Sequence, residues 1–205
     1  MPKEEKITVI LATHNTNKVR EYREMLHDRP IDLRLPDEAE GKVLAAVEEN
    51  GKTYAENALL KARAIHDLVG GYVMADDSGL SLDVLDGYPG IYSARFAGED
   101  TSYPDKIQQL WKLLAKYPES DWTAAFHAAI AWIDPEGGEY TFTGRCDGKV
   151  IHEMRGKNGF GYDPVFFMEQ YGMTTAEMDP DFKNSISHRG KAVEQWLKFI
   201  DEHHA

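Results

Sequence analysis

Cysteine, long apolar runs and positive charge are all scarce in this sequence of 205 residues. The single cysteine, Cys146, allows no intrachain disulfide and no cysteine cluster for zinc. No apolar run approaches the ~20 residues that a membrane-spanning helix needs. Residues 1–6 contain no apolar signal region. These absences predict a cytoplasmic protein that does not associate with membranes.

The charge balance is strongly acidic, with 23 Lys and Arg against 35 Asp and Glu and a formal net charge of −12. Binding to a nucleic-acid backbone needs a positive surface, so we expect no nucleic-acid partner. A small polyanionic ligand is still compatible, because a few basic side chains can converge on one pocket. The sequence shows neither internal repeats nor a long linker, which predicts one domain over residues 1–205.

Residues 72–80 read Tyr-Val-Met-Ala-Asp-Asp-Ser-Gly-Leu. The apolar run 72–75 predicts a strand that leads into Asp76 and Asp77, and α/β sheets bind ligands at the carboxyl ends of their strands. Two adjacent carboxylates repel each other, and Mg²⁺ with phosphate oxygens would compensate their charge. The alternative is an exposed turn, because Asp, Ser and Gly are common in turns for local reasons.

The N-terminal region predicts a strand, a polar turn and a helix in succession. Residues 7–12 form a β-rich run without alternation, as expected of a strand that is buried on both faces. Residues 13–17 supply turn and N-cap side chains, and Lys18 follows in the first helical turn. A helix N-terminus with a nearby cation can bind a phosphate. The alternative is an ordinary capped helix with a solvated lysine.

Other patterns complete the expected α/β fold. They predict a strand at 31–35, an acidic loop to about Gly41, a helix between Glu48 and Leu68 that Gly70 and Gly71 end, a helix at 103–116, strands at 122–134 and 140–143 joined by a hairpin turn, and a last helix from about Ser187. The hairpin predicts an antiparallel pair, so the sheet should be mixed.

Two C-terminal stretches are candidates for ligand binding. Residues 155–164 form a glycine-rich loop, in which Phe160 could stack on a planar ligand or fold back as a lid on the core. His188 and Arg189 lie at a predicted helix N-terminus, which is unfavourable for cations. They therefore suggest an anionic or polar ligand, with a solvated basic cluster as the alternative.

Two further residues have less specific surroundings. Arg95 is flanked by apolar residues, so it should either be paired or point toward an anion, because unpaired burial of a charge is unfavourable. His127 lies inside a predicted strand, and we expect a structural histidine there rather than a catalyst.

Taken together, six segments resemble the inosine/xanthosine triphosphate pyrophosphatase family, whose members act on noncanonical purine nucleotides. The segments follow the family's order over nearly the whole chain, at residues 12–18, 56–58 with 61–62, 75–80, 89–96, 159–164 and 187–190. The resemblance implies an elongated mixed β-sheet with flanking helices, two lobes around a central substrate cleft, and a homodimer. It also implies Mg²⁺-dependent hydrolysis of dITP, ITP or XTP to the nucleoside monophosphate and pyrophosphate.

The resemblance also implies roles for individual residues. Asp77 is similar to the family's catalytic acid–base, and Glu48 falls with Asp77 at the metal-ligand positions. The stretch implied to bind the triphosphate comprises Thr13, His14, Asn15, Thr16, Asn17 and Lys18. The other implied substrate contacts are Ser78, Phe160, Gly161, Tyr162, Asp163, Lys183, His188 and Arg189.

Three rival interpretations are compatible with the same residues. The chain could be a pyrophosphatase for modified pyrimidine nucleotides or a broader metal-dependent phosphohydrolase. It could also be a nucleotide-binding regulator without activity. The adjacent carboxylates Asp76 and Asp77 argue against a regulator, which would have little need of metal-binding groups.

Overall fold

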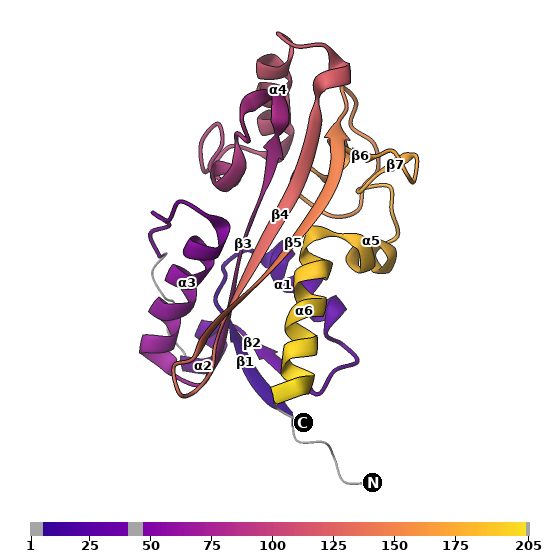
Figure 1. Ribbon diagram of the computed structural model, residues 1–205. Helices are drawn as coiled ribbons and strands as arrows, with labels where there is room; N and C mark the ends of the chain where they lie inside the picture. The colour runs from indigo at the N-terminus through magenta and orange to yellow at the C-terminus, as the bar shows by residue number, and fades with distance from the viewer. Residues whose placement is uncertain (1–5, 41–46, 204–205) are drawn as a thin grey trace. The chain divides into compact units, whose positions relative to one another are not determined.

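A mixed seven-stranded sheet organises the computed structural model, which describes residues 6–40 and 47–203 (Figure 1). The sheet order is β2-β1-β3-β4-β5-β6-β7. β1 pairs in parallel with β2 and β3, whereas β5–β6 and β6–β7 are antiparallel pairs. The strands are β1 (Ile7–Leu11), β2 (Ile31–Arg34), β3 (Tyr72–Leu82), β4 (Thr123–Ile133), β5 (Glu139–Val150), β6 (Phe166–Met168) and β7 (Met173–Thr174). The predicted α/β class with a mixed sheet is thus confirmed.

The described helices begin and end at residues suited to those positions. They are α1 (Thr16–Met25), α2 (Pro36–Glu40), α3 (Tyr54–Val69), α4 (Tyr103–Leu114), α5 (Pro180–Ile186) and α6 (His188–His203). Thr53 and Glu56 form a capping box at the start of α3, and Gly70 ends that helix with a φ of 63°. Among the described residues, no helix is long and apolar enough to cross a membrane.

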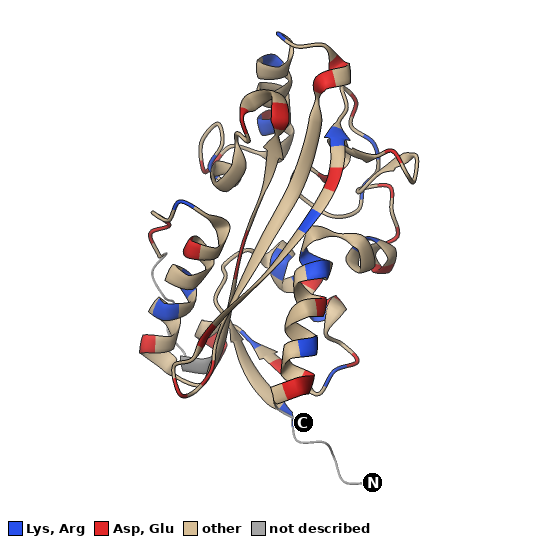
Figure 2. Ribbon diagram, in the orientation of Figure 1, with Lys and Arg blue, Asp and Glu red and all other residues tan. Residues whose placement is uncertain are grey.

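Charged residues of both signs are interspersed along α3 and α6 rather than gathered by sign (Figure 2). Charged side chains elsewhere also form ion pairs near the surface, such as Glu139 of β5 with Arg63 of α3 and Lys149 of β5 with Glu169. Exposed pairs of this kind contribute roughly 0–1 kcal/mol each to the free energy of unfolding. They therefore help little to explain why the fold is stable.

The structure corrects several sequence-based expectations. β3 does not end at Ala75 but continues to Leu82, so the exposed-turn interpretation of Asp76 and Asp77 is wrong. The stretch expected to be a loop up to about Gly41 contains α2; Gly41 itself lies outside the described residues. The helix predicted between Glu48 and Leu68 is present as α3, and its capping box fixes the N-terminus at Tyr54. The short elements α5, β6 and β7 were not predicted.

The chain divides into two compact units. Unit 1 comprises residues 1–77, 129–143 and 192–205, and unit 2 comprises residues 78–128 and 144–191. Three strands, β3, β4 and β5, contribute residues to both units. The boundary in β3 falls between Asp77 and Ser78, two adjacent residues of the predicted site.

Unit 1 buries both faces of its strands, as the apolar run 7–12 predicts. Successive residues of a strand point to opposite faces. One face packs on α1 and α6 and includes Leu11, Met74 and Trp132. The other face packs on α3 and includes Ile10, Val73 and Ala131. This alternation decides which helix Asp76 and Asp77 of β3 meet.

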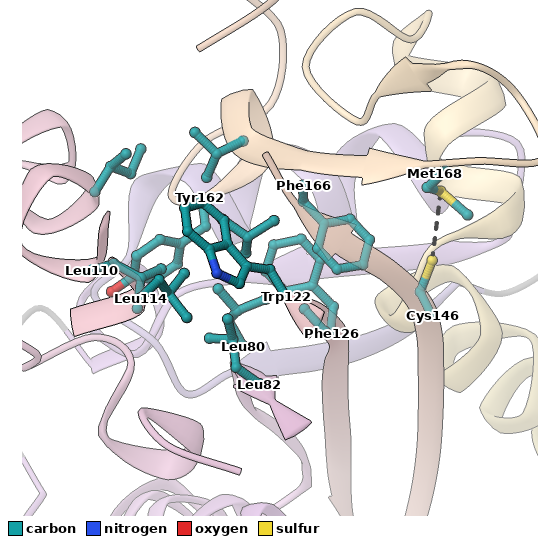
Figure 3. Packing of buried hydrophobic residues seen from close by; sticks show 14 of the residues in the cluster. Leu80, Leu82, Leu110, Leu114, Trp122, Phe126, Cys146, Tyr162, Phe166 and Met168 are labelled. Atoms are coloured by element: carbon teal, nitrogen blue, oxygen red, sulfur yellow. Dashed lines mark hydrogen bonds between the residues drawn. The ribbon is translucent and has the colours of Figure 1, made fainter. Parts of the chain in front are cut away.

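Unit 2 has its own core, in which α4 packs on the ends of β3, β4 and β5 (Figure 3). The rings of Phe126 and Phe166 lie 4.3 Å apart between centroids. The thiol of Cys146 is buried and contacts the sulfur of Met168 at 3.7 Å. Replacing a fully buried aromatic residue such as Phe166 by Ala would lower the free energy of unfolding by about 3–5 kcal/mol.

Candidate active site

In unit 1, the paired aspartates of β3 point to opposite faces of the sheet. Asp76 is 0% exposed and Asp77 is 5% exposed. Met74 lies on the α1 face, so the strand alternation sends Asp76 to α1 as well. Val73 and Ala75 lie on the α3 face, and Asp77 follows them toward α3. Adjacent carboxylates thus meet different partners.

Asp76 is held by strong partners from α1. Lys18 forms an ion pair with its carboxylate, and the hydroxyl of Tyr22 donates to Oδ2 at 2.9 Å. Lys18 Nζ also donates to the main-chain carbonyl of Asp76 at 3.1 Å. A buried carboxylate with a cation and a hydroxyl donor is well compensated. This set of contacts fits a structural role for Asp76.

Asp77 has weaker contacts on the α3 face. Asn57 Nδ2 donates to Oδ2 at 3.2 Å, and Lys61 Nζ lies 3.5 Å from Oδ1. Burial raises the pKa of Asp77, while the positive charges of Lys61 and Lys18 oppose that rise. The nearby Glu49 carboxylate raises the same pKa further. A carboxylate with a raised pKa is a better proton acceptor than an ordinary aspartate.

A second carboxylate approaches this site, but it belongs to Glu49 rather than to Glu48. Lys61 Nζ contacts Glu49 Oε1 at 2.8 Å and also donates to the carbonyl of Asp76 at 2.8 Å. The side chain of Glu48 is exposed. Lys61 lies one helical turn after Asn57, so both side chains project from the same face of α3. Sequence reasoning gave no role to Glu49, Asn57 or Lys61.

The start of α1 is a capped helix, but Lys18 is not the solvated lysine of the alternative interpretation, because its side chain is 11% exposed and pairs with Asp76. Asn15 is the N-cap, and its Oδ1 accepts from the main-chain N–H groups of Asn17 at 3.0 Å and Lys18 at 3.2 Å. Thr13 Oγ1 accepts from the N–H of Asn15 at 3.1 Å. The side chains of His14 and Thr16 are exposed. Two of the N–H groups that could bind a phosphate therefore already have an acceptor.

The residues around Asp77 fit a divalent metal in their chemistry. Asp77 and Glu49 supply hard carboxylate oxygens, and both contact the same ammonium group of Lys61. Among the residues that the structure describes, no group of three His, Cys, Asp or Glu side chains is arranged to hold a metal. Mg²⁺ does not need such a cage, because it uses one or two carboxylates together with substrate phosphates and water.

In unit 2, the carboxylate of Asp163 organises the glycine-rich loop. Its Oδ2 accepts from Lys183 Nζ at 2.6 Å and from the N–H of Phe160 at 2.8 Å. Its Oδ1 accepts from the hydroxyl of Thr175 at 2.8 Å. Gly159 has a φ of 71°, and a Cβ there would lie 2.0 Å from Asp163 Oδ2. Glycine is therefore the only residue that this close approach accepts.

The predicted cations of unit 2 gather around the ring of Phe160. Lys183 Nζ lies 5.5 Å from the ring centroid and Arg189 Cζ lies 5.7 Å from it, both within cation–π distance. Arg189 Nη2 also donates to Ser78 Oγ at 2.9 Å. Lys183 and Arg189 are buried, which excludes a solvated basic cluster. The loop, α5, the start of α6 and Ser78 thus supply one polar centre.

The remaining predicted contacts of unit 2 have structural partners. Tyr162 is buried in the core, where its hydroxyl donates to the carbonyl of Ser93 at 3.1 Å and burial raises its pKa. Gly161 has a φ of 69° and lies near the ring of Tyr103. The ring of His188 stacks on Phe126 with centroids 4.9 Å apart.

Two other residues singled out in the sequence lie within unit 2. The guanidinium of Arg95 is 5.5 Å from the ring of Tyr92. His127 Nε2 lies 2.8 Å from Ser81 Oγ, and burial lowers its pKa. These contacts agree with the structural role expected for His127.

Comparison with known proteins gives consistent matches over nearly the whole chain. A dITP/XTP pyrophosphatase of Desulforamulus reducens is 42% identical over 193 residues, which cover 94% of this chain and 95% of the relative. The same name is borne by a Bacillus cereus relative that is 41% identical over 95% of both chains.

Solved structures agree with this match. A HAM1 protein from Coxiella burnetii has a TM-score of 0.86 and 37% identity, and the match covers 96% of this chain and 99% of that chain. The Ham1 protein of Staphylococcus aureus has a TM-score of 0.83 and 33% identity, with 95% and 98% covered. The Ham1 family model itself matches residues 9–199. The chain therefore belongs to the Ham1 family.

Proposed function

We propose that this chain hydrolyses the noncanonical purine nucleoside triphosphates dITP, ITP and XTP to the monophosphate and pyrophosphate. Its relatives share the name dITP/XTP pyrophosphatase, which supports this substrate class. The observation that carries the proposal is the state of Asp77, a buried carboxylate with a raised pKa beside Lys61 and Glu49. Such a group is suited to accept a proton next to a polyanionic substrate.

In the proposed reaction, water attacks the α-phosphorus and Asp77 accepts its proton. A bond forms between the water oxygen and phosphorus, the bond to the bridging oxygen breaks, and pyrophosphate leaves. Lys61 and Lys18 neutralise negative charge near the reacting phosphates. Asn57 orients the Asp77 carboxylate through its 3.2 Å hydrogen bond. The other residues of 13–18 are proposed to contact the triphosphate.

Asp77 and Glu49 would hold a Mg²⁺ ion, and Glu49 takes the place that the sequence resemblance gave to Glu48. The support for this change is that Glu49 contacts Lys61, whereas the Glu48 side chain is exposed. When bound, Mg²⁺ neutralises phosphate oxygens and lowers the pKa of coordinated water.

The proposed base contacts lie in unit 2. Phe160 stacks on the purine, while Lys183 and Arg189 supply hydrogen-bond donors to a 6-oxo group. ATP carries a 6-amino group, which would turn its hydrogens toward these donors and leave them unpaired. A site built on hydrogen bonds can reject such an analogue by ~10⁴ or more. The other proposed substrate contacts in unit 2 are Ser78, Gly161, Tyr162, Asp163 and His188. Several of these residues act by shaping the glycine-rich loop.

The family resemblance also supports proposals about the whole protein. The family match runs through both units, in keeping with one catalytic domain over residues 1–205. We propose a homodimer in the cytoplasm, where the nucleotide pool is found. Nucleic acid and membranes are not proposed partners.

A nucleotide panel with product analysis tests the proposal. Purified protein should release pyrophosphate from ITP, dITP or XTP in the presence of Mg²⁺ far faster than from ATP, dTTP or UTP. Release of orthophosphate would contradict the proposed reaction. A preference for modified pyrimidine triphosphates would favour the rival pyrophosphatase, and binding without turnover would favour a regulator.

A further inference from the structure

Thr175 lies beside the polar centre of unit 2 and has no role in the proposal above. It follows β7 and is 3% exposed. Its hydroxyl lies 2.8 Å from Asp163 Oδ1 and 3.2 Å from the Asp163 carbonyl. The acceptor at 2.8 Å has the better distance and carries a charge, so the hydroxyl donates to the carboxylate.

The segment that carries Thr175 braces the glycine-rich loop through its main chain as well. The carbonyl of Ala176 accepts from the N–H groups of Lys157 at 3.0 Å and Asn158 at 2.9 Å. The N–H of Ala176 donates to the Asp163 carbonyl at 3.3 Å, and the N–H of Thr175 donates to Phe166. Main-chain contacts therefore fix the backbone of Thr175. A substitution that removes its hydroxyl leaves these main-chain contacts in place.

Asp163 transmits this constraint to the two groups proposed to contact the base. Its Oδ2 accepts from Lys183 Nζ and from the N–H of Phe160, so the position of this oxygen sets both the cation and the ring. A carboxylate held only at one oxygen can rotate about its Cβ–Cγ bond. The Thr175 hydroxyl, bonded to the other oxygen, restricts that rotation.

We infer that Thr175 is a positioning residue for base selectivity, because it fixes the Asp163 carboxylate that orients Lys183 and Phe160. Without the hydroxyl, Asp163 Oδ1 becomes a free acceptor and can take a hydrogen bond from the 6-amino group of adenine. Lys183 at the same time loses its fixed orientation toward a 6-oxo group. Selectivity for ITP over ATP then falls. This inference rests on the proposed function.

Two substitutions at Thr175 separate the hydroxyl from the packing. Thr175→Val keeps the shape and removes the hydroxyl, and Thr175→Ser keeps the hydroxyl. For Thr175→Val we expect KM for ITP to rise about tenfold with kcat little changed, and the ratio of kcat/KM for ITP over ATP to fall about tenfold, as for loss of a hydrogen bond to a charged group. Thr175→Ser should restore both values.

Thr174→Val is the matched control. Thr174 is the adjacent residue and is fully buried, and its hydroxyl has other acceptors than Asp163: the carbonyl of Arg155 at 3.0 Å and Glu177 Oε2 at 3.2 Å. The Thr174→Val variant should have a lower melting temperature, with an unchanged ratio of kcat/KM for ITP over ATP. The inference is overturned if Thr175→Val leaves the ratio unchanged, if Thr175→Ser behaves like Thr175→Val, or if Thr174→Val lowers the ratio equally. Wild-type protein that fails to hydrolyse ITP would instead contradict the proposed function.

Discussion

The carboxylates of Asp77 in unit 1 and Asp163 in unit 2 are both buried, but they differ in how their charge is compensated. Asp163 receives three donors at 2.6–2.8 Å, including the ammonium group of Lys183. The contacts of Asp77 are longer, at 3.2 and 3.5 Å, and a second carboxylate lies close to the same lysine. Strong compensation is typical of an organising group, and incomplete compensation is typical of a reactive one.

Asp77→Asn should give the largest effect on turnover. The amide has the same shape but cannot accept the proton of the attacking water, so kcat should fall on the order of a thousandfold or more. Because the contacts of Asp77 are weak, the melting temperature should change little. Steady-state pyrophosphate release and thermal melting measure both effects. Retained turnover would remove Asp77 from the chemistry.

Asp163→Asn should show the opposite pattern, with its main effect on stability. It leaves the Lys183 ammonium buried without its counter-ion, which lowers the free energy of unfolding by about 3–5 kcal/mol. Denaturant titration measures this loss. The control is Asp147→Asn, which breaks an exposed pair with Arg145, in which the side chains are 71% and 55% exposed. Equal denaturant midpoints for Asp163→Asn and Asp147→Asn would contradict the organising role of Asp163.

Glu49→Ala and Glu48→Ala compare two neighbouring carboxylates in unit 1. If Glu49 helps to hold Mg²⁺, its loss should raise the Mg²⁺ concentration for half-maximal activity about tenfold or more. Glu48→Ala should behave as wild type. Calorimetric titration of Mg²⁺ into each protein gives a second readout without turnover. A large effect of Glu48→Ala alone would restore the original assignment.

Phe160→Ala tests whether the purine base stacks on the ring of Phe160. Stacking of a base on an aromatic ring contributes roughly 1–3 kcal/mol, so affinity for ITP, ATP and GTP alike should fall about tenfold. Binding of each nucleotide can be followed by calorimetry. Unchanged affinity would favour the interpretation of Phe160 as a lid on the core.

His127 gives the smallest expected effect, through the pH dependence of stability. Burial and the charge of Arg145 lower its pKa from the ordinary 6.5. Below that value the unfolded chain binds the proton more readily than the folded chain, so stability should fall as the pH drops below about 6.5. Melting temperatures between pH 8 and 5 should therefore fall more for wild type than for His127→Asn. Parallel curves would mean that His127 does not contribute.

Local patterns in the sequence predicted much of the fold and part of the site. The apolar run 7–12, the N-cap side chains within 13–17 and the glycine stop after α3 act over a few residues, and the structure has each of these features, with Asn15 as the N-cap. The length of β3 was missed, because Asp76 and Asp77 read as a turn while their compensating partners lie in distant helices.

The residues that sequence reasoning missed act through long-range contacts. Lys61 contacts Glu49 and Asp77, and Thr175 contacts Asp163. The partners in each contact are 12 or more residues apart in the sequence, and no helical or strand periodicity connects them. A motif such as Glu56-Asn57 with Lys61 marks the right helix but does not say which acceptor each side chain meets. Only the strand alternation in the folded sheet determines that Asp77, and not Asp76, faces them.

Hydrolysis of ITP in oxygen-18-labelled water with Mg²⁺ tests the central claim most directly. Mass spectrometry then locates the label among the products. Attack of water on the α-phosphorus predicts labelled IMP and unlabelled pyrophosphate. Label in pyrophosphate, or release of orthophosphate and IDP, would contradict the proposed reaction.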